Sequence, residues 1–396
     1  MCRMPLDRCR RVMTLAAVTA IPALLLVPSA GADSGDPVTL PPLRQRMAAE
    51  EPCATASTKV AQMSPWTHRA LQLSRSWQLT RGAGVTVGVV DTGVGARVPA
   101  LDGRVTAVDG AGEDCVGHGS FAAGLIAGAP TGRGHVTGVA PAARILAVRG
   151  TDTRGVPDAG LIARGIRTAV DKGARVVYVG QALGAGSAEL TAAVAYAAGK
   201  DVLVVAPAVP DTAPRGADGR PDTRARPYWP AAQPRVLSVV DHGPDGRRPE
   251  NAPLALAPDL SAPGDAVVGI GVRGPGHFIG SGSSLAAAHV AGAAALLRAY
   301  HPDLDAVATA RRLTEAAYPE HTPRLDVYAG LTALLAAERA PAEKSPDPAV
   351  VPASASAGPR SRALLIGGGS LVLVLLVGAA MVVVPLGKAR GWRPAG

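Results

Sequence analysis

Short runs of valine and isoleucine alternate with alanine-rich segments through the middle of this chain, and the alternation limits the folds that it can adopt. The runs lie at 85–90, 145–148, 176–179, 202–205 and 236–240, and the segments between them include 158–172 and 187–198. Because the runs are rich in valine and isoleucine and do not alternate regularly between apolar and polar residues, both faces of the corresponding strands are expected to be buried, as in parallel sheets covered by helices. The sequence therefore predicts an α/β fold, an open parallel sheet with helices on both faces.

Three chemically active side chains lie where this fold would form a site. Asp91 comes directly after the first run, at the carboxyl end of its strand, where open α/β sheets place their sites. His118 lies between Gly117 and Gly119 at the expected start of a helix, and Ser284 begins an apolar helix. A serine hydroxyl becomes a nucleophile when a base takes its proton, and a carboxylate must hold that base in one tautomer. Each residue alone would be an ordinary turn, loop or capping residue, whereas together they predict nucleophilic catalysis.

The segments around these residues resemble those of the subtilisin-like serine proteases. They read Val-Val-Asp-Thr-Gly at 89–93, Gly-His-Gly-Ser at 117–120 and Gly-Ser-Ser-Leu-Ala at 282–286, and they follow the family's order along the chain. The resemblance implies a subtilisin-like fold and hydrolysis of peptide bonds in a polypeptide substrate. It also implies that Asp91, His118 and Ser284 form the catalytic triad. Neither a cofactor nor a metal is expected.

A closer resemblance is to the mycosins, the membrane-anchored subtilisin-like proteases of actinobacterial type VII secretion systems. It depends on Pro65-Trp66, on Leu-Thr-Arg-Gly-Ala-Gly-Val at 79–85 and on Asp-Cys-Val-Gly-His-Gly at 114–119. It implies an enzyme outside the cytoplasm that associates with components of the type VII secretion machinery.

The expected oxyanion site departs from the family pattern. The backbone N–H of Ser284, at the start of its helix, is expected to be one oxyanion donor. The family has an Ala-Gly-Asn turn after the strand at 202–206, whereas this chain has Ala208, Val209 and Pro210. Proline has no donor, and in subtilisin the loss of this Asn donor lowers kcat by about 10² to 10³. Pro210 at the expected Asn position therefore predicts reduced activity, which Pro210→Asn is expected to raise.

Two functions from different classes are consistent with these motifs. The first is an active, membrane-tethered serine endopeptidase, which the intact Asp, His and Ser favour. The second is a catalytically impaired pseudoprotease that acts as a structural or binding component of the secretion complex, which the absence of the Asn favours.

The two ends of the chain contain apolar segments of different kinds. Residues 1–32 combine a basic start, a short apolar core interrupted by Pro22, and an Ala-Gly-Ala cleavage site, as is typical of a secretory signal peptide. Residues 363–386 are uncharged and apolar, and about 20 such residues suffice to span a bilayer. Lys388 and Arg390 follow on the side that is expected to be cytoplasmic. A buried core helix is the alternative for this segment, but the segment has glycines and no polar face.

These segments divide the chain into consecutive predicted parts. They are a signal peptide (1–32), an N-terminal extension (33–64), a subtilisin-like protease domain (65–337), a Pro- and Ala-rich stalk (338–362), a transmembrane helix (363–386) and a cytoplasmic tail (387–396). The protease domain is therefore expected outside the cytoplasm, held at the cell membrane by a single span.

The cysteine pattern agrees with export. Cys2 and Cys9 lie in the predicted signal peptide, so Cys53 and Cys115 would remain in the mature chain. Two thiols in an oxidising compartment most simply form a disulfide, and their placement matches the mycosin layout. A metal site is the alternative, but two cysteines without clustered partners are a poor ligand set.

The net charge of +9 does not indicate a nucleic-acid partner. Almost all of the excess positive charge lies in the first 12 residues and after residue 359, which are the targeting segment and the flanks of the predicted span. The intervening part is close to neutral. A surface that neutralises phosphates is therefore not expected.

The predicted topology can be tested by protease shaving of intact cells. An external protease should remove the body of the protein and leave a tag after Gly396 intact, because the tail is expected to lie behind the membrane. Immunoblotting of the tag before and after detergent lysis measures this protection. Loss of the tag in unlysed cells would reverse the orientation.

Overall fold

The computed structural model describes residues 38–131, 136–335 and 357–391 and divides the chain into two units, Met1–Ala333 and Leu334–Gly396. The predicted signal peptide and most of the predicted stalk lie outside the described residues. The elements of the first unit are α1 (Trp66–Ala70), α2 (Leu73–Ser76), β1 (Thr86–Asp91), η1 (Pro99–Leu101), β2 (Val105–Ala107), α3 (His118–Ala127), β3 (Arg144–Arg149), α4 (Ala159–Asp171), β4 (Val176–Val179), α5 (Ala188–Gly199), β5 (Leu203–Pro207), β6 (Val236–His242), β7 (Leu260–Pro263), β8 (Val267–Ile270), β9 (His277–Gly280), α6 (Ser283–Tyr300), α7 (Ala306–Glu315) and α8 (Val327–Thr332).

A 7-stranded sheet forms the centre of this unit, with strand order β2-β3-β1-β4-β5-β6-β7. Every neighbouring pair in it is parallel. The five predicted strands correspond to β1, β3, β4, β5 and β6. The prediction of an open parallel sheet is therefore confirmed. The short strands β2 and β7 and the antiparallel pair β8–β9 were not predicted, since they have no continuous run of Val and Ile.

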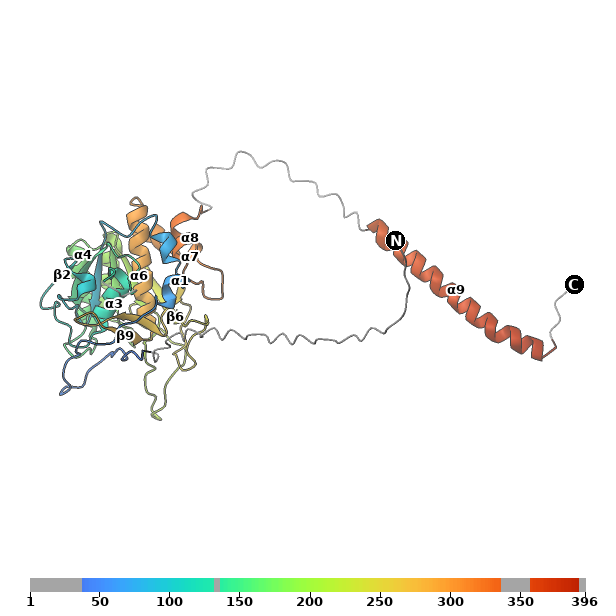
Figure 1. Ribbon diagram of the computed structural model, residues 1–396, viewed down its shortest axis with the longest axis horizontal. Coiled ribbons are helices and arrows are strands. Elements are labelled where there is room, and N and C mark those ends of the chain that lie inside the picture. Colours follow the sequence, from blue (N-terminus) through green and yellow to red (C-terminus); the bar gives the residue numbers. More distant parts are fainter. Residues whose placement is uncertain (1–37, 132–135, 336–356, 392–396) are drawn as a thin grey trace, which may run out of the picture. The chain divides into compact units, whose positions relative to one another are not determined.

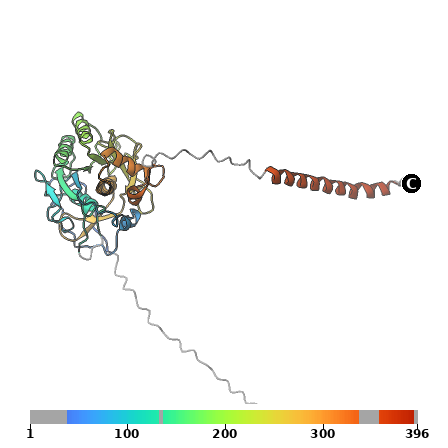
Figure 2. The same ribbon diagram turned by 90° about the horizontal axis from the view of Figure 1, so that it is seen from above.

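Helices cover both faces of the sheet, which explains why its strands are apolar throughout (Figure 1). On β1, Val87 and Val89 belong to the core that contains α3 and α6, while Val90 belongs to the core under α4 and α5. Gly88 lets α4 approach closely, because a Cβ there would lie 2.7 Å from the Cβ of Ala169. Figure 2, turned by 90°, shows the helices arranged around the sheet.

Two helices begin where their capping residues predict. Asp158 accepts a hydrogen bond from the N–H of Leu161 at 2.7 Å and begins α4, and Ser187 accepts one from Leu190 at 3.1 Å and begins α5. Such caps satisfy N–H groups that have no partner inside the helix. Both helices follow the predicted segments to within about one residue, so local sequence determines these crossovers.

The second unit contains α9 (Ala357–Ala389). Its segment Arg362–Ala389 is 28 residues long with a mean hydropathy of 2.6. By length and composition this is a helix that can cross a membrane. It includes the predicted transmembrane segment.

The N-terminal extension follows the surface of the first unit and pairs with it through the backbone. Leu43 donates to the carbonyl of Ile279 at 2.7 Å, and Ile279 donates back to Pro41 at 3.0 Å, so the extension lies along β9. Further along, His277 donates to the carbonyl of Lys59 at 2.7 Å. The extension therefore forms part of the folded unit.

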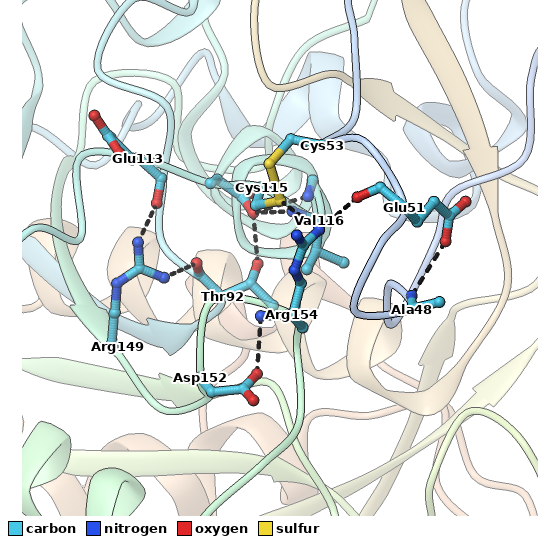
Figure 3. The surroundings of a disulfide bond; sticks show 12 residues. Ala48, Glu51, Cys53, Thr92, Glu113, Cys115, Val116, Arg149, Asp152 and Arg154 are labelled. Carbon is cyan, nitrogen blue, oxygen red and sulfur yellow. Dashed lines mark hydrogen bonds between the residues drawn. A yellow bond between two sulfur atoms is a disulfide. The ribbon is translucent and has the colours of Figure 1, made fainter.

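A disulfide joins Cys53 of the extension to Cys115, two residues before the loop glycine that precedes His118 (Figure 3). The pairing predicted from the cysteine count is thus present. Next to it, Arg154 donates to the carbonyl of Glu51 at 2.6 Å, and Ala54 donates to the carbonyl of Cys115 at 2.7 Å. The extension is therefore fixed, covalently and by hydrogen bonds, to the loop that leads into α3.

The disulfide should be measurable by intact mass after alkylation. Protein alkylated after reduction should be heavier by two alkyl groups than protein alkylated without reductant. Because the crosslink joins residues 62 apart, the double variant Cys53→Ser/Cys115→Ser should lose about 4 kcal/mol of unfolding free energy in the chain-entropy model. Equal masses with both thiols modified would show that the cysteines are free.

Candidate active site

The structure brings Asp91, His118 and Ser284 into one chain of hydrogen bonds. The Nδ1 atom of His118 lies 2.9 and 2.8 Å from the two carboxylate oxygens of Asp91, and its Nε2 atom lies 2.9 Å from the hydroxyl oxygen of Ser284. All three residues are at most 1% exposed. The residues come from the end of β1 and the first turns of α3 and α6. Segments far apart along the chain, such as those of His118 and Ser284 with 166 residues between their positions, thus converge at the carboxyl edge of the sheet.

The Asp91 carboxylate fits only because a glycine follows the neighbouring strand β4. A Cβ at Gly180, directly after β4, would lie 1.7 Å from the Oδ2 atom of Asp91. The added Cβ would also lie 2.9 Å from the hydroxyl oxygen of Tyr178, whose side chain is fully buried. Asp91 also accepts a hydrogen bond from the N–H of Thr92 at 2.6 Å. Gly180 therefore leaves the space in which the carboxylate meets the imidazole.

A second buried carboxylate, Asp114, positions the turn that carries His118. Its Oδ1 atom accepts from the N–H of Gly117 at 2.8 Å and from the hydroxyl of Thr92 at 2.9 Å, and its Oδ2 atom accepts from the N–H of Ser120 at 2.9 Å. Burial raises the pKa of Asp114, while these hydrogen bonds act in the opposite direction. The sequence analysis missed this residue. An acidic residue just before a helix is a known capping signal and would have pointed to it.

Ser284 is held at the N-terminus of α6 by its neighbours. Ser283 donates its hydroxyl to the Oδ1 atom of Asp241 at 2.6 Å, and Arg248 donates to the same oxygen at 2.9 Å. Gly282 precedes them with a φ of +155°, a conformation that favours glycine. This arrangement fixes the first turn of the helix, so the Ser284 N–H points away from the helix body.

A third carboxylate, that of Asp211, contacts Ser284 directly. Its Oδ1 atom accepts from the Ser284 N–H at 2.8 Å, and its Oδ2 atom accepts from the Ser284 hydroxyl at 2.5 Å. The Oδ2 atom also lies 3.5 Å from the Nε2 atom of His118. The Asp211 carboxylate therefore lies close to both Ser284 and His118, while the Asp91 carboxylate contacts His118 from the other side.

The sequence analysis placed Pro210, not Asp211, at the family's Asn position. Pro210 lines the same cavity as His118, but the side chain that contacts Ser284 belongs to the next residue. Counting from the strand gave Pro210, and the path of the turn after β5 brings Asp211 to the serine instead. Counting residues does not show how a turn orients its side chains, so sequence reasoning missed Asp211. The side chain that meets the serine is therefore that of Asp211.

The surroundings of His118 act on its pKa in opposing ways. Burial lowers the pKa, but attraction to Asp91 and hydrogen bonding with Asp211 and Asp91 raise it well above its ordinary value. The protonated imidazole thus stabilises the fold below the ordinary pKa of about 6.5, and this contribution is lost as the pH rises through the raised folded-state pKa. A base must be neutral, so the same shift moves base catalysis toward higher pH.

A cavity of about 620 Å³ opens beside these residues and contains His118, Pro210 and Asp211 in its lining. Gln45 and Arg46 of the N-terminal extension also line it, and Thr212 donates its hydroxyl to the side-chain oxygen of Gln45 at 3.0 Å. Its size lies within the range of ligand sites, about 300–1,000 Å³. The extension therefore forms part of the wall beside the candidate nucleophile.

Other candidate groups do not join the site. His289 in α6 is 3% exposed, and its Nδ1 atom is 2.8 Å from the carbonyl oxygen of Pro263. Burial lowers its pKa to about 4. His289 is therefore a buried helix residue that packs against β7. Among the described residues, no group of three or more His, Cys, Asp or Glu is arranged to hold a metal ion.

Comparisons with known proteins identify the family to which this fold belongs. Residues 82–340 match the model of the subtilase family, Peptidase_S8. Mycosin-3 of Mycobacterium tuberculosis is 32% identical, over 90% of this chain and 91% of that protein. The solved structure of the MycP3 protease from the type VII (ESX-3) secretion system is 30% identical with a TM-score of 0.61, over 74% of this chain and 96% of that one. A chain in the periplasmic assembly from the ESX-5 inner membrane complex is 25% identical with a TM-score of 0.60, over 80% of this chain and 97% of that one.

The role of Gly180 can be tested with a glycine-to-alanine pair. In Gly180→Ala the new methyl group overlaps the Asp91 carboxylate, so His118 should lose its orientation. The rate at which a fluorophosphonate labels Ser284 should fall by about 10² or more, short of the ~10⁴ lost in trypsin when its triad carboxylate is replaced. Gly199→Ala, where nothing lies within 4 Å of the added Cβ, is the matched control and should label normally. A normal rate in Gly180→Ala would mean that Asp91 does not orient the base.

Proposed function

The chain belongs to the subtilase family, and we propose that it is a membrane-anchored serine endopeptidase of the mycosin type with Asp91, His118 and Ser284 as its catalytic triad. The observation that carries the proposal is the continuous hydrogen-bond chain from the Asp91 carboxylate through both nitrogens of His118 to the Ser284 hydroxyl. Carboxylate, imidazole and hydroxyl in this order form an activated nucleophile.

Each member of the chain has a defined task. His118 takes the proton of Ser284 as the hydroxyl oxygen attacks a peptide carbonyl, and later gives that proton to the leaving amine. Asp91 accepts from Nδ1, which keeps Nε2 free to act as the base, and stabilises the imidazolium that forms. The Ser284 N–H lies at the start of α6 and is an oxyanion donor by position. No cofactor is needed for this reaction.

A polypeptide substrate and a membrane location accompany this function. The cavity beside His118 is lined by Gly180, Gln181 and the turn after β5, so backbone groups at the ends of two strands are available to an extended peptide. The apolar segment Arg362–Ala389 supports anchoring by one span. The body is then extracytoplasmic and the tail after residue 386 is cytoplasmic.

Association with a type VII secretion system is part of the proposal. Similarity to Mycosin-3 over nearly the full length of both chains supports it, as does similarity to a chain of the ESX-5 periplasmic assembly. The partners would then be membrane or periplasmic components of such a system.

One observation favours a second function, a pseudoprotease that serves the secretion complex by binding. Asp211 is a carboxylate at the place where the reaction needs a donor, and it accepts the Ser284 N–H at 2.8 Å. An acceptor there opposes the negative charge that develops on the substrate carbonyl. The two functions differ in whether Ser284 reacts, and this can be measured directly.

The full-length protein, solubilised in detergent, should react with a fluorophosphonate probe at Ser284. The probe reports nucleophilic attack by a base-activated serine and does not depend on peptide specificity. Gel fluorescence and peptide mapping identify the labelled residue. Ser284→Ala and His118→Ala should both abolish the signal.

Absence of labelling in folded wild-type protein would favour the pseudoprotease. Thermal unfolding of the same sample supplies the folding control. A signal that persists in Ser284→Ala would show that another residue reacts and that the nucleophile is wrongly assigned.

A further inference from the structure

The carboxylate of Asp211 occupies the place of an oxyanion next to Ser284. An oxyanion formed by attack of Ser284 must accept a hydrogen bond from the Ser284 N–H. That N–H instead donates to the Oδ1 atom of Asp211 at 2.8 Å, and the attacking hydroxyl donates to Oδ2 at 2.5 Å. The Asp211 side chain is only 8% exposed, so these contacts lie inside the site.

The backbone around the serine accommodates this carboxylate closely. A Cβ at Gly282 would lie 2.1 Å from the Cγ atom of Asp211, so no residue with a side chain fits there unless Asp211 moves away. Two oxygens of one carboxylate thus meet two atoms of Ser284, which fixes both the position and the orientation of the group.

We propose that Asp211 is the side-chain oxyanion residue of this enzyme, and that a proton on its carboxyl group switches it between a blocking state and a catalytic one. The ionised carboxylate accepts the Ser284 N–H and fills the oxyanion position. The protonated carboxyl group donates its O–H to the oxyanion, as the amide of the family's Asn does. This inference depends on the proposed peptidase function and specifies how that site is regulated.

His118 is the natural exchange partner for this proton. Its Nε2 atom lies 3.5 Å from the Oδ2 atom of Asp211, and the Ser284 hydroxyl lies between them, 2.9 Å from Nε2 and 2.5 Å from Oδ2. One proton can therefore sit on His118 with Asp211 ionised, or on Asp211 with His118 neutral, at the same total charge. Only the second form has both a base and an oxyanion donor. Opposite charges this close in a buried site attract strongly, so the resting protein is mostly in the first, blocked form.

Several elements contribute the other ionisable groups around His118 and Asp211. Asp91 faces the Nδ1 atom of His118. Tyr178 is fully buried nearby, and burial together with repulsion between its phenolate form and the Asp91 carboxylate raises its pKa well above the ordinary value. The charged groups lining the two cavities that share Asp211 are Arg46 and Arg226 on one side and Asp241, Arg248 and Asp265 on the other. Of these, Asp241 is paired with Arg248 at 2.9 Å.

In the catalytic form, acylation uses Ser284 as the nucleophile, His118 as the base and Asp211 as an oxyanion donor. The Ser284 oxygen bonds to the peptide carbonyl carbon, its proton moves to Nε2 of His118, and the carbonyl electron pair moves to the oxygen. That oxyanion accepts from the Ser284 N–H and from the Asp211 O–H. The pair then returns to form the carbonyl as the C–N bond breaks, and Nε2 gives its proton to the leaving amine. Asp211 keeps its own proton throughout, and no further reactant is consumed.

Asp211→Asn in the full-length protein tests the switch, because an amide donates at every pH. We expect kcat for a peptide ester at neutral pH to rise about 10-fold or more, since one oxyanion donor is worth about 10² to 10³ in kcat. KM should stay nearly constant, because the donor acts mainly on the tetrahedral state. The wild type should also lose activity at alkaline pH, where the shared proton leaves His118 and Asp211, whereas Asp211→Asn should stay active there because its amide donor is permanent.

Two further variants separate blocking from donation. Asp211→Ala removes the carboxylate without supplying a donor, so it should also keep its activity at alkaline pH but reach a lower kcat than Asp211→Asn. Asp245→Asn removes an exposed carboxylate, 66% exposed beside Arg247, and should match the wild type. Equal rates in the Ala and Asn variants would overturn the donor role.

Fluorophosphonate labelling separates failure of this inference from failure of the proposed function. Labelling of the wild type with an unchanged rate and pH profile in Asp211→Asn would overturn the switch alone. Labelling of Asp211→Asn at a higher rate than the wild type would support the switch and show that the blocked form dominates. If folded wild type and Asp211→Asn both fail to label, the switch and the peptidase function fall together.

Discussion

The buried carboxylate of Asp91 is the constraint on which the rest of the site depends. An ionised carboxylate that is 0% exposed is stable only with close partners, because its desolvation costs several kcal/mol. The partners are the Nδ1 atom of His118 and the N–H of Thr92. To bring the imidazole there, α3 must begin at residue 118 and pass close to the turn after β1. Gly119 permits this approach, since a Cβ there would lie 2.1 Å from the carbonyl oxygen of Gly93.

A second carboxylate on the opposite side of the same imidazole changes what the site can do. Asp91 faces Nδ1 and Asp211 faces Nε2, so the protonated ring lies between two negative charges and is stabilised by both. Catalysis needs the neutral ring, and the electrostatics that stabilise the folded site therefore work against its chemistry. Such conflict between stability and activity is common where active sites hold charged groups. It also explains how one chain can keep Asp, His and Ser and still be consistent with two functions.

The N-terminal extension belongs to this site rather than to a separate segment. The Cys53–Cys115 disulfide fixes it to the loop before His118, and backbone pairing with β9 holds its earlier part. Gln45 and Arg46 consequently line the cavity beside the nucleophile. The cavity beside His118 and Asp211 is thus lined in part by residues that precede the subtilase match at 82–340.

Local sequence patterns were sufficient to predict the parallel sheet, the two crossover helices, the apolar C-terminal helix, the disulfide and the candidate residues Asp91, His118 and Ser284. These patterns are valine-rich runs, helical segments that begin at Asp158 and Ser187, and short motifs around each reactive side chain. The roles of Asp114 and Asp211 became visible only in the folded protein, because they depend on contacts between distant segments. Asp114 reaches the turn before α3, and Asp211 reaches Ser284 from a turn 73 residues away. The orientation of that turn follows from the packing of β5, α6 and the residues between them. Counting along the chain therefore indicated Pro210, whereas the folded chain places the carboxylate of Asp211 against Ser284.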